Sequence, residues 1–190
     1  MTRALASAMA AITLLAGSGP ARAESFDSRD LMGGGPNFIA GGVSPIPRTT
    51  VNFDGQYAPG TIVVNTAERR LYLVLPNGQA LRYGIGVGRD GFRWSGVHRV
   101  SAKKEWPSWT PPSQMLARRP DLPRHMAGGI DNPLGARAIY LGSTLYRIHG
   151  SNEPETIGQA VSSGCFRMTN DDVADLYNRV SVGATVIVKN

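Results

Sequence analysis

The chain has 190 residues, which suits one domain with a tail, and it carries 20 lysine and arginine residues against 14 acidic ones. The formal net charge of +6 suits contact with an anionic polymer such as a cell wall, and it serves solubility equally well. The basic residues form no dense tract of the kind that binds nucleic acid, and a single cysteine excludes an internal disulfide.

The N-terminus has the pattern of a secretory signal peptide. Arg3 precedes an apolar run from Ala4 to Ala16, and small residues end the segment at Ala23. The run is shorter than the roughly 20 apolar residues of a membrane-spanning helix, and no cysteine near the cleavage site supports a lipid anchor. We therefore expect a signal peptide at 1–23, export to the periplasm or cell wall, and no stable membrane insertion after cleavage. A retained anchor is the alternative.

Residues 24–56 are rich in glycine, proline, serine, asparagine and aspartate, and they show little hydrophobic periodicity. This composition is typical of a flexible or extended leader. We therefore place a domain boundary at residue 57, with the folded domain over 57–190.

The rest of the chain is dominated by short β-rich segments. Apolar and β-branched runs predict strands over 61–65, 71–75, 80–87, 138–141, 145–148 and 185–188. The turn signal Pro76-Asn77-Gly78 joins the second and third of these as a hairpin. The stretch 94–135 has no clear period, and we expect it to form a long loop region that shapes a site.

One segment has a helical period, with apolar residues at i, i+3, i+4 and i+7 between positions 173 and 180. Thr169 or Asn170 is the expected N-cap, and Gly183 is the expected end. Many short strands with one clear helix predict a mainly β fold, specifically a β-sandwich with one helix after the cysteine.

The chemistry of the chain is expected around its cysteine. Cys165 lies in the sequence SSGCFRM, which occupies 162–168. A thiol attacks as its thiolate and needs a nearby base, and His149, at the end of a predicted strand, is the candidate. Gly164 permits a sharp turn, and the N–H groups of Gly164 and Cys165 are candidate donors to an oxyanion. Arg167 is a candidate for bidentate binding of a carboxylate.

Each of these residues also has a purely structural interpretation. An isolated cysteine is often a small buried apolar residue, and a histidine at a strand end is often a structural hydrogen-bond donor. Arg167 has Asp171 and Asp172 as candidate ion-pair partners on the following helix. The combination of these residue types at this spacing favours a nucleophilic site.

Taken together, His149-Gly150, the sequence at 162–168 and Asp172 resemble the signature of the L,D-transpeptidases of the YkuD family. The resemblance covers about residues 57–190 and extends to the segments 57–65, 71–78, 86–88, 106–112 and 131–142. It implies a β-sandwich with the cysteine in a cleft beside the helix, and it makes 57–190 an L,D-transpeptidase catalytic domain.

The resemblance further implies acyl transfer on peptidoglycan tetrapeptide stems. Cys165 would attack the bond between the L-centre of the diamino acid at position three and D-Ala at position four. D-Ala would leave, and the thioester would pass to an amine of another stem or of a wall-attached protein. His149 would act as base and then as acid, oriented by the backbone carbonyl of Gly150. Carbapenem-type β-lactams would be inhibitors, and the chemistry needs no cofactor.

The resemblance also suggests which side chains contact the substrate. Ser163 stands where some family members carry a second histidine, and we expect it to position substrate. Trp109 and Met126, in the long loop region, are expected to contact a glycan or a stem peptide, with packing against the sandwich as the alternative. His98 and His125 have no place in the motif and are expected to be surface or structural residues. No metal-ligand spacing links the histidines with the cysteine.

The residues leave other functions open. Water as the acceptor would make the chain a carboxypeptidase or endopeptidase with the same acyl-enzyme chemistry. A wall-binding module with an inert thiol is a further alternative. A thiol–disulfide oxidoreductase is disfavoured because the sequence has no second cysteine to resolve a mixed disulfide.

Overall fold

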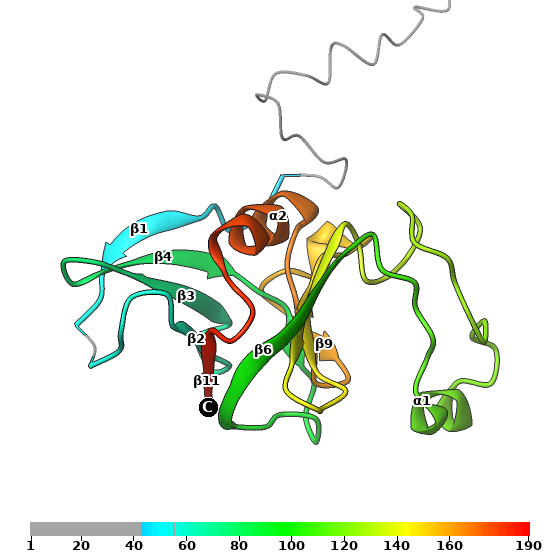
Figure 1. The fold of residues 1–190 in the computed structure, drawn as a ribbon. Helices are drawn as coiled ribbons and strands as arrows, with labels where there is room; N and C mark the ends of the chain where they lie inside the picture. Colours follow the sequence, from blue (N-terminus) through cyan, green and yellow to red (C-terminus); the bar gives the residue numbers. More distant parts are fainter. Residues whose placement is uncertain (1–42, 55) are drawn as a thin grey trace, which may run out of the picture. The chain divides into compact units, whose positions relative to one another are not determined.

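The computed structural model describes residues 43–54 and 56–190, so the predicted signal peptide and most of the predicted leader lie outside the described residues. Figure 1 shows the elements coloured along the chain. In chain order they are β1 (Thr49–Asn52), β2 (Ile62–Asn65), β3 (Arg70–Leu75), β4 (Gln79–Gly84), β5 (Val87–Gly88), β6 (Gly96–Glu105), α1 (Ser113–Arg118), β7 (Arg137–Leu141), β8 (Arg147–His149), the 3-10 helix η1 (Pro154–Thr156), β9 (Ala160–Ser162), β10 (Phe166–Arg167), α2 (Asn170–Arg179) and β11 (Thr185–Lys189).

Most strands of the described chain belong to one curled sheet in the order β1-β4-β3-β2-β11-β6-β7-β8-β10, while β5 and β9 pair separately. β6 belongs to both halves of this sheet, because it pairs with β11 along its first part and with β7 along its second. The register shifts between Val100 and Ala102, and such an irregularity bends a strand. The sheet therefore folds over at β6, so that its two halves enclose a core.

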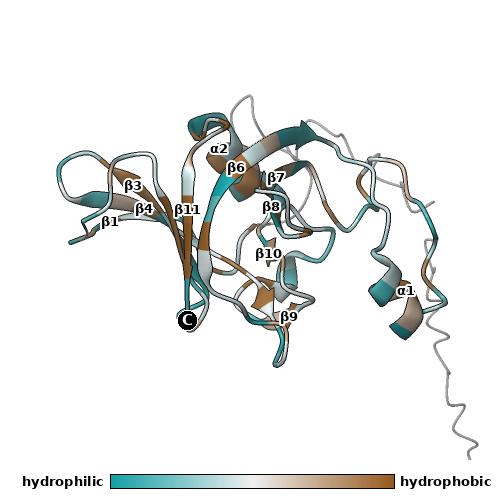
Figure 2. Ribbon diagram, turned by 60° about the horizontal axis from the view of Figure 1, so that its bottom comes forward, coloured by the Kyte–Doolittle hydropathy of each residue, from teal (hydrophilic) through white to brown (hydrophobic). Residues whose placement is uncertain are grey.

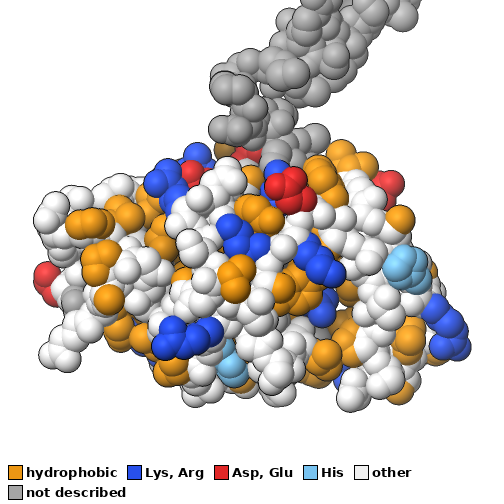
Figure 3. All heavy atoms as spheres, in the orientation of Figure 1, with side chains coloured by type: hydrophobic (Ala, Val, Ile, Leu, Met, Phe, Trp, Pro, Cys, Tyr) orange, Lys and Arg blue, Asp and Glu red, His pale blue; other side chains and the backbone are white. Residues whose placement is uncertain are grey.

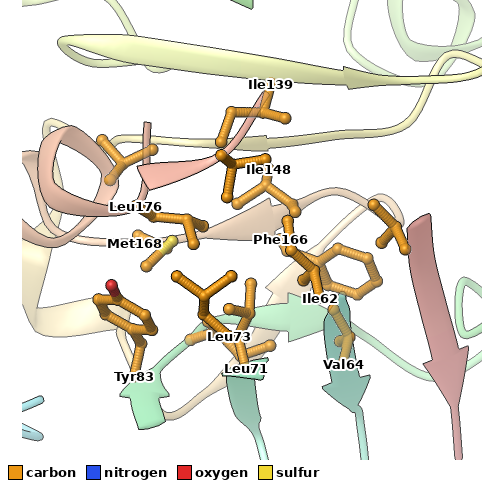
Figure 4. Packing of buried hydrophobic residues seen from close by; sticks show 14 of the residues in the cluster. Ile62, Val64, Leu71, Leu73, Tyr83, Ile139, Ile148, Phe166, Met168 and Leu176 are labelled. Carbon is orange, nitrogen blue, oxygen red and sulfur yellow. The ribbon is translucent and has the colours of Figure 1, made fainter. Parts of the chain in front are cut away.

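The core lies between these halves. Ile62 and Leu71 on β2 and β3 meet Ile139 and Ile148 on β7 and β8, and all four side chains are fully buried (Figure 4). Leu176 of α2 is buried in the same cluster. Burial of each such side chain stabilises the fold by about 1.5–3 kcal/mol. The mainly β fold predicted from the sequence is confirmed, and its sandwich is formed by one sheet facing itself.

Each segment predicted to be extended contains a strand, although β8 covers only the second half of the segment predicted over 145–148. The segment predicted as one strand over 80–87 is interrupted after Gly84 and gives β4 and β5. The turn at Pro76-Asn77-Gly78 joins β3 and β4 as an antiparallel hairpin, and both Asn77 and Gly78 have positive φ. The apolar colouring of β3 and β11 in Figure 2 follows the runs on which these predictions rest.

The loop predicted over 94–135 is wrong in two places, because β6 occupies Gly96–Glu105 and the helix α1 occupies Ser113–Arg118. Only Val100 of this strand is buried, and its other side chains are partly or fully exposed. Much of β6 is accordingly polar in Figure 2. The strand is held by its two neighbours in the sheet and shows little of the apolar pattern that marks a buried strand.

The segment just before the predicted domain boundary at residue 57 contains a strand of the sheet. β1, at Thr49–Asn52, pairs antiparallel with β4 and extends the sheet by one strand. Just before it, Ile46 fills the space beside Gly84 and Gly158, where any larger residue would collide with it. Arg48 forms an ion pair with Asp172 of α2 at 3.2 Å. The last part of the predicted leader is therefore built into the domain.

The predicted helix is confirmed as α2, which begins at Asn170 and ends at Arg179. Thr169 is its N-cap, and its hydroxyl accepts the N–H of Asp172 at 3.3 Å. The helix ends before Gly183, because Val180 is already extended.

No helix in the described part of the chain is long and apolar enough to cross a membrane. On the face shown in Figure 3, basic side chains are spread among apolar ones and do not merge into one patch.

Candidate active site

The predicted nucleophile and base are brought together by two neighbouring parallel strands. β8 and β10 pair so that Phe166 lies opposite Ile148, and Arg167 lies opposite His149. Ile148 and Phe166 point into the core. Because successive side chains of a strand point to opposite faces, the other face carries the alternate residues of this pair. These are Arg147, His149, Cys165 and Arg167.

A groove of about 1040 Å³ opens over this face. The side chains that the sequence analysis assigned to the site all line it, namely Cys165, His149, Arg167, Ser163, Trp109 and Met126. The two remaining histidines do not. His98 packs edge-on against Trp94, and Nδ1 of His125 lies 3.2 Å from Oγ1 of Thr110.

The turn before the cysteine is held by Ser162, to which the sequence analysis assigned no role. Its Oγ accepts the N–H of Gly164 at 3.1 Å and donates to the carbonyl oxygen of Cys165 at 2.6 Å. The N–H of Gly164 is therefore used inside the turn, and the prediction that it binds an oxyanion is not supported by this arrangement. The N–H of Cys165 has no acceptor within residues 43–54 and 56–190, so it remains the candidate donor.

Gly164 is required for a second reason. Its φ of 109° lies in the left-handed region, and a Cβ here would overlap the ring of Tyr146. Trp94 stacks on Tyr146 with ring centroids 4.5 Å apart, and its indole N–H donates to the carbonyl oxygen of Gly164 at 2.8 Å. The stacked rings of Trp94 and Tyr146 thus pack against the turn and limit its movement. The sequence analysis missed this support, because no local pattern links the two aromatic residues.

His149 is held as a neutral base. Its ring is buried, and Nδ1 donates to the carbonyl oxygen of Gly150 at 2.6 Å, since a carbonyl can only accept. This leaves the lone pair on Nε2. Burial lowers the pKa of His149 to about 3, and the positive charge of Arg167 acts in the same direction. The carbonyl oxygen that the resemblance predicts to orient the ring of His149 is thus in hydrogen-bond contact with it.

Gly150 is in turn held by Asn170, which the sequence analysis considered only as a helix cap. The Asn170 side chain is buried, and its Oδ1 accepts the N–H of Ala136 at 2.9 Å. A Cβ at either Gly135 or Gly150 would overlap this oxygen. The first residue of α2 therefore packs directly against Gly150 and leaves no room for a side chain there.

The thiol is protonated at rest. Burial raises the pKa of Cys165, and this effect is opposed by the charge and the backbone N–H of Arg147 and by the charge of Arg167. The thiol donates weakly to the carbonyl oxygen of Leu145 at 3.8 Å. A neutral thiol and a neutral imidazole therefore line the same groove.

Arg167 already binds a carboxylate of its own chain. Its Nη1 lies 2.7 Å from Oε2 of Glu153, which belongs to the turn before η1. The guanidinium is thus neutralised in this structure, which weakens the prediction that it clamps a substrate carboxylate. The alternative pairing with Asp172 does not occur, because that residue pairs with Arg48.

The predicted substrate contacts Trp109 and Met126 lie on one arm, which we define as residues 106–131. Their backbone N–H groups and carbonyls bond reciprocally at 2.8 Å, so the arm closes on itself. Its helix α1 has no buried residue, and Figure 1 shows it to one side of the strands. Asn132, which is buried, anchors the base of the arm by donating to the carbonyl oxygen of Ala127 at 2.8 Å.

The family model of the L,D-transpeptidase catalytic domain, YkuD, matches residues 59–188. The chain belongs to the YkuD family. The resemblance found in the sequence is thereby confirmed. The family is one of catalytic domains, so the chain is classed as an enzyme. Within the described residues, no group of three or more histidine, cysteine, aspartate and glutamate side chains is arranged to hold a metal ion.

Related proteins agree with this assignment. The chain is 42% identical over 134 residues to the probable L,D-transpeptidase ErfK/SrfK of Escherichia coli K12, which covers 66% of this chain and 42% of that protein. The chain spans half or less of the length of this protein and of the probable L,D-transpeptidase YcfS of the same organism, to which it is 38% identical over 162 residues.

Two solved structures share the YkuD fold. L,D-transpeptidase 3 from Mycobacterium tuberculosis, in complex with a faropenem-derived adduct, matches with a TM-score of 0.56 at 17% identity over 68% of this chain and 60% of that chain. A Brucella melitensis protein named as a probable carnitine operon oxidoreductase, caia, matches with a TM-score of 0.52 at 46% identity over 77% of this chain and 96% of that chain.

Proposed function

We propose that this chain is a peptidoglycan L,D-transpeptidase that uses Cys165 as its nucleophile. The observation that supports this most strongly is the pairing of β8 with β10. It places the thiol on the same face as His149, a buried imidazole whose Nδ1–H is committed to a carbonyl and whose Nε2 is left as a base. This is the arrangement that nucleophilic acyl transfer requires.

The first half of the reaction forms a thioester. As Sγ of Cys165 attacks the carbonyl carbon of the diamino acid at stem position three, its proton passes to Nε2 of His149. The N–H of Cys165 donates to the oxyanion, which in favourable cases contributes about 3 kcal/mol. The C–N bond then breaks, and the imidazolium returns its proton to the amine of the departing D-Ala. Because burial holds the pKa of His149 near 3, this protonated form is a strong acid and gives up the proton readily.

The second half transfers the acyl group. Neutral His149 takes a proton from the incoming amine as the amine nitrogen attacks the thioester carbon. The C–S bond then breaks, and the imidazolium returns the proton to the sulfur of Cys165, which restores the thiol. An amine from another stem would give a 3-3 cross-link, and an amine from a wall-attached protein would tether that protein. Water would give an L,D-carboxypeptidase or endopeptidase instead. The residues around the thiol do not select among these acceptors.

The groove supplies the contacts for such a substrate. Trp109, Met126 and Ser163 line it and are proposed to contact the stem or its glycan, while Gly150 orients the base. Arg167 is proposed to act together with Glu153 as a polar wall of the groove, and it binds substrate directly only if that ion pair opens. Carbapenem-type β-lactams, as acylating analogues of the stem, are proposed to inhibit the chain.

The proposed location follows from the substrate. Peptidoglycan stems lie outside the cytoplasmic membrane, and residues 1–23 have the pattern of a signal peptide. We therefore place the protein in the periplasm or at the cell wall, with no nucleic acid as partner and no cofactor in the reaction.

A redox function is a weaker candidate, although one relative carries an oxidoreductase name. Dithiol chemistry needs a second cysteine to resolve the mixed disulfide, and Cys165 is the only one in the sequence. A wall-binding module with an inert thiol would not require the hydrogen bond that holds His149 in one tautomer.

The test is to incubate the purified protein with disaccharide-tetrapeptides and to measure the products by mass spectrometry. We expect loss of the mass of D-Ala together with cross-linked dimers. Cys165→Ala and His149→Ala should abolish both products, whereas His125→Ala, a histidine outside the groove, should retain them. Retained activity in Cys165→Ala would overturn the mechanism, and hydrolysed tripeptides without dimers would identify water as the acceptor.

A further inference from the structure

The groove holds more positive charge than its own carboxylates neutralise. Five arginines line it, and two of these have acidic partners: Arg119 pairs with Asp121, and Arg167 pairs with Glu153. The other three, Arg89, Arg118 and Arg147, form no ion pair within the described residues. Arg89 and Arg118 both lie against the ring of Phe92, at one end of the groove. Arg147 alone of these three stands beside the nucleophile.

The position of Arg147 follows from the strand register. Phe166 lies opposite Ile148, so the residues one position earlier, Arg147 and Cys165, are neighbours across the same pair of strands. Neighbouring strands are roughly 4.8 Å apart. Both residues line the groove. Arg147 is therefore the neighbour, on the adjacent strand, of the residue that would attack a substrate.

The guanidinium of Arg147 is held against an aromatic ring, but it forms no ion pair with an acidic side chain of the described residues. It lies over the ring of Tyr140, 5.4 Å from its centroid, and Tyr140 is the residue opposite Arg147 on β7. Its Nε is buried, and it has no hydrogen-bond partner. A buried donor without a partner is costly, typically by about 1–3 kcal/mol, and a guanidinium fork matches the geometry of a carboxylate. These features favour the binding of a carboxylate by Arg147.

We propose that Arg147 binds the terminal carboxylate of the donor peptide, one residue beyond the bond that Cys165 attacks. This inference rests on the proposed function, because it assigns part of the donor stem to a residue of that site. In a peptide that ends one residue after the scissile bond, the carboxylate carbon lies roughly 3 to 4 Å from the attacked carbonyl carbon. An arginine on the strand beside the thiol has the reach to meet it.

This contact makes binding depend on the length of the donor stem peptide. A stem that ends in D-Ala at position four presents its carboxylate to Arg147, whereas a pentapeptide presents an uncharged peptide group at that place. The site therefore selects tetrapeptides, and it does so by charge. Arg167, which the sequence analysis preferred for this task, has its guanidinium occupied by Glu153.

Binding to a variant that cannot turn over gives the cleanest test. We would measure, by titration calorimetry on Cys165→Ala, the affinity for the tetrapeptide L-Ala-γ-D-Glu-L-Lys-D-Ala and for its C-terminal carboxamide. The acid should bind about 10- to 100-fold more tightly than the amide, as expected for a charge-assisted hydrogen bond. Adding Arg147→Gln should remove that preference, while Arg147→Lys, which keeps the charge without the fork, should retain part of it.

Two controls distinguish carboxylate binding by Arg147 from a general loss of positive charge and from misfolding of a variant. Arg82→Gln, a change of equal charge on β4 in the other half of the sheet, should leave the preference intact, and circular dichroism should show that each variant is folded. Equal affinity of Cys165→Ala for acid and amide would overturn the proposal, as would an unchanged preference after Arg147→Gln. If the acid preference depends on Arg147 but the wild type transfers no acyl group to any acceptor, the carboxylate site stands and the proposed function fails.

Discussion

The catalytic face of β8 and β10 and the arm at 106–131 form two sides of one groove, but they are built differently. The strands place His149 and Cys165 directly above the buried side chains of Ile148 and Phe166. The arm places Trp109 and Met126 on a segment closed mainly by its own backbone bonds, with a helix that buries nothing. The groups that we propose to react are thus held by the core, and the groups that we propose to contact substrate are held by a less embedded segment. A rigid base serves chemistry because small displacements of a nucleophile are costly.

The largest effect is expected when the thiol is removed from the side of the groove formed by β8 and β10. Cys165→Ser keeps the shape of the residue but replaces a good nucleophile with one that His149 activates poorly. We expect product formation to fall by at least about 1,000-fold, with no change in thermal stability. The measurement is the initial rate of D-Ala release, set beside the melting temperature of the same preparation. An equally large loss after a substitution in the arm would contradict the division between the two sides.

The buried histidine should also make the protein sensitive to acid. Its pKa is lowered to about 3 in the folded chain, while an unfolded histidine titrates near 6.5, so the unfolded state binds the proton first. Stability that is present above about pH 6.5 is therefore lost as the pH falls toward 3.

Between pH 7 and 4.5 we expect the free energy of unfolding to drop by about 2 to 3 kcal/mol from this group alone. Urea unfolding at the two pH values gives this difference for the wild type and for His149→Gln, which should lose less on acidification. His125→Gln, which alters an exposed histidine of the arm, should behave as the wild type. If all three proteins lost the same free energy of unfolding on acidification, His149 would not be the cause of the loss.

The turn that carries the nucleophile is the next most sensitive point. Gly164→Ala introduces a Cβ against the ring of Tyr146 at a φ of 109°, so the turn or the ring must move. We expect a decrease in kcat of about 10- to 100-fold with a loss of about 1–3 kcal/mol in stability. Gly129→Ala in the arm is the matched control, because open space surrounds that position. Unchanged kcat in Gly164→Ala would show that the turn does not need its observed conformation.

The smallest effect is expected on the arm side. Trp109→Ala should raise KM by about 3- to 10-fold and leave kcat and the melting temperature nearly unchanged, because Trp109 is only partly buried. Steady-state kinetics with a tetrapeptide donor separate the two constants. A fall in kcat without a change in KM would place Trp109 in the chemistry rather than in binding.

The strands that could be predicted from the sequence are those with apolar runs. β2 and β3 bury more than half of their side chains, and every buried residue in them is β-branched or aliphatic. β1 and β6 escaped prediction because exposure frees their side chains from any apolar pattern. β10 has only two residues, and it exists because β8 offers it a partner. Elements of this kind depend on long-range pairing, and local sequence carries little sign of it.

The candidate site divides in the same way. Cys165, His149 and Gly150 could be identified from the sequence, because the residue types and their spacing carry the chemistry. The roles of Ser162 and Asn170 could not, because each acts through a backbone group that only the folded chain brings near.

By itself, then, the sequence determined the family and the mainly β class, and it singled out Cys165 and His149 as the candidate nucleophile and base. Only the tertiary structure decided which groups are charged and which are already paired. Burial holds the thiol and the imidazole neutral, Glu153 occupies Arg167, and the register of β8 with β10 leaves Arg147 unpaired beside the thiol. These properties arise from the distances between residues far apart along the chain, and such distances are set by packing.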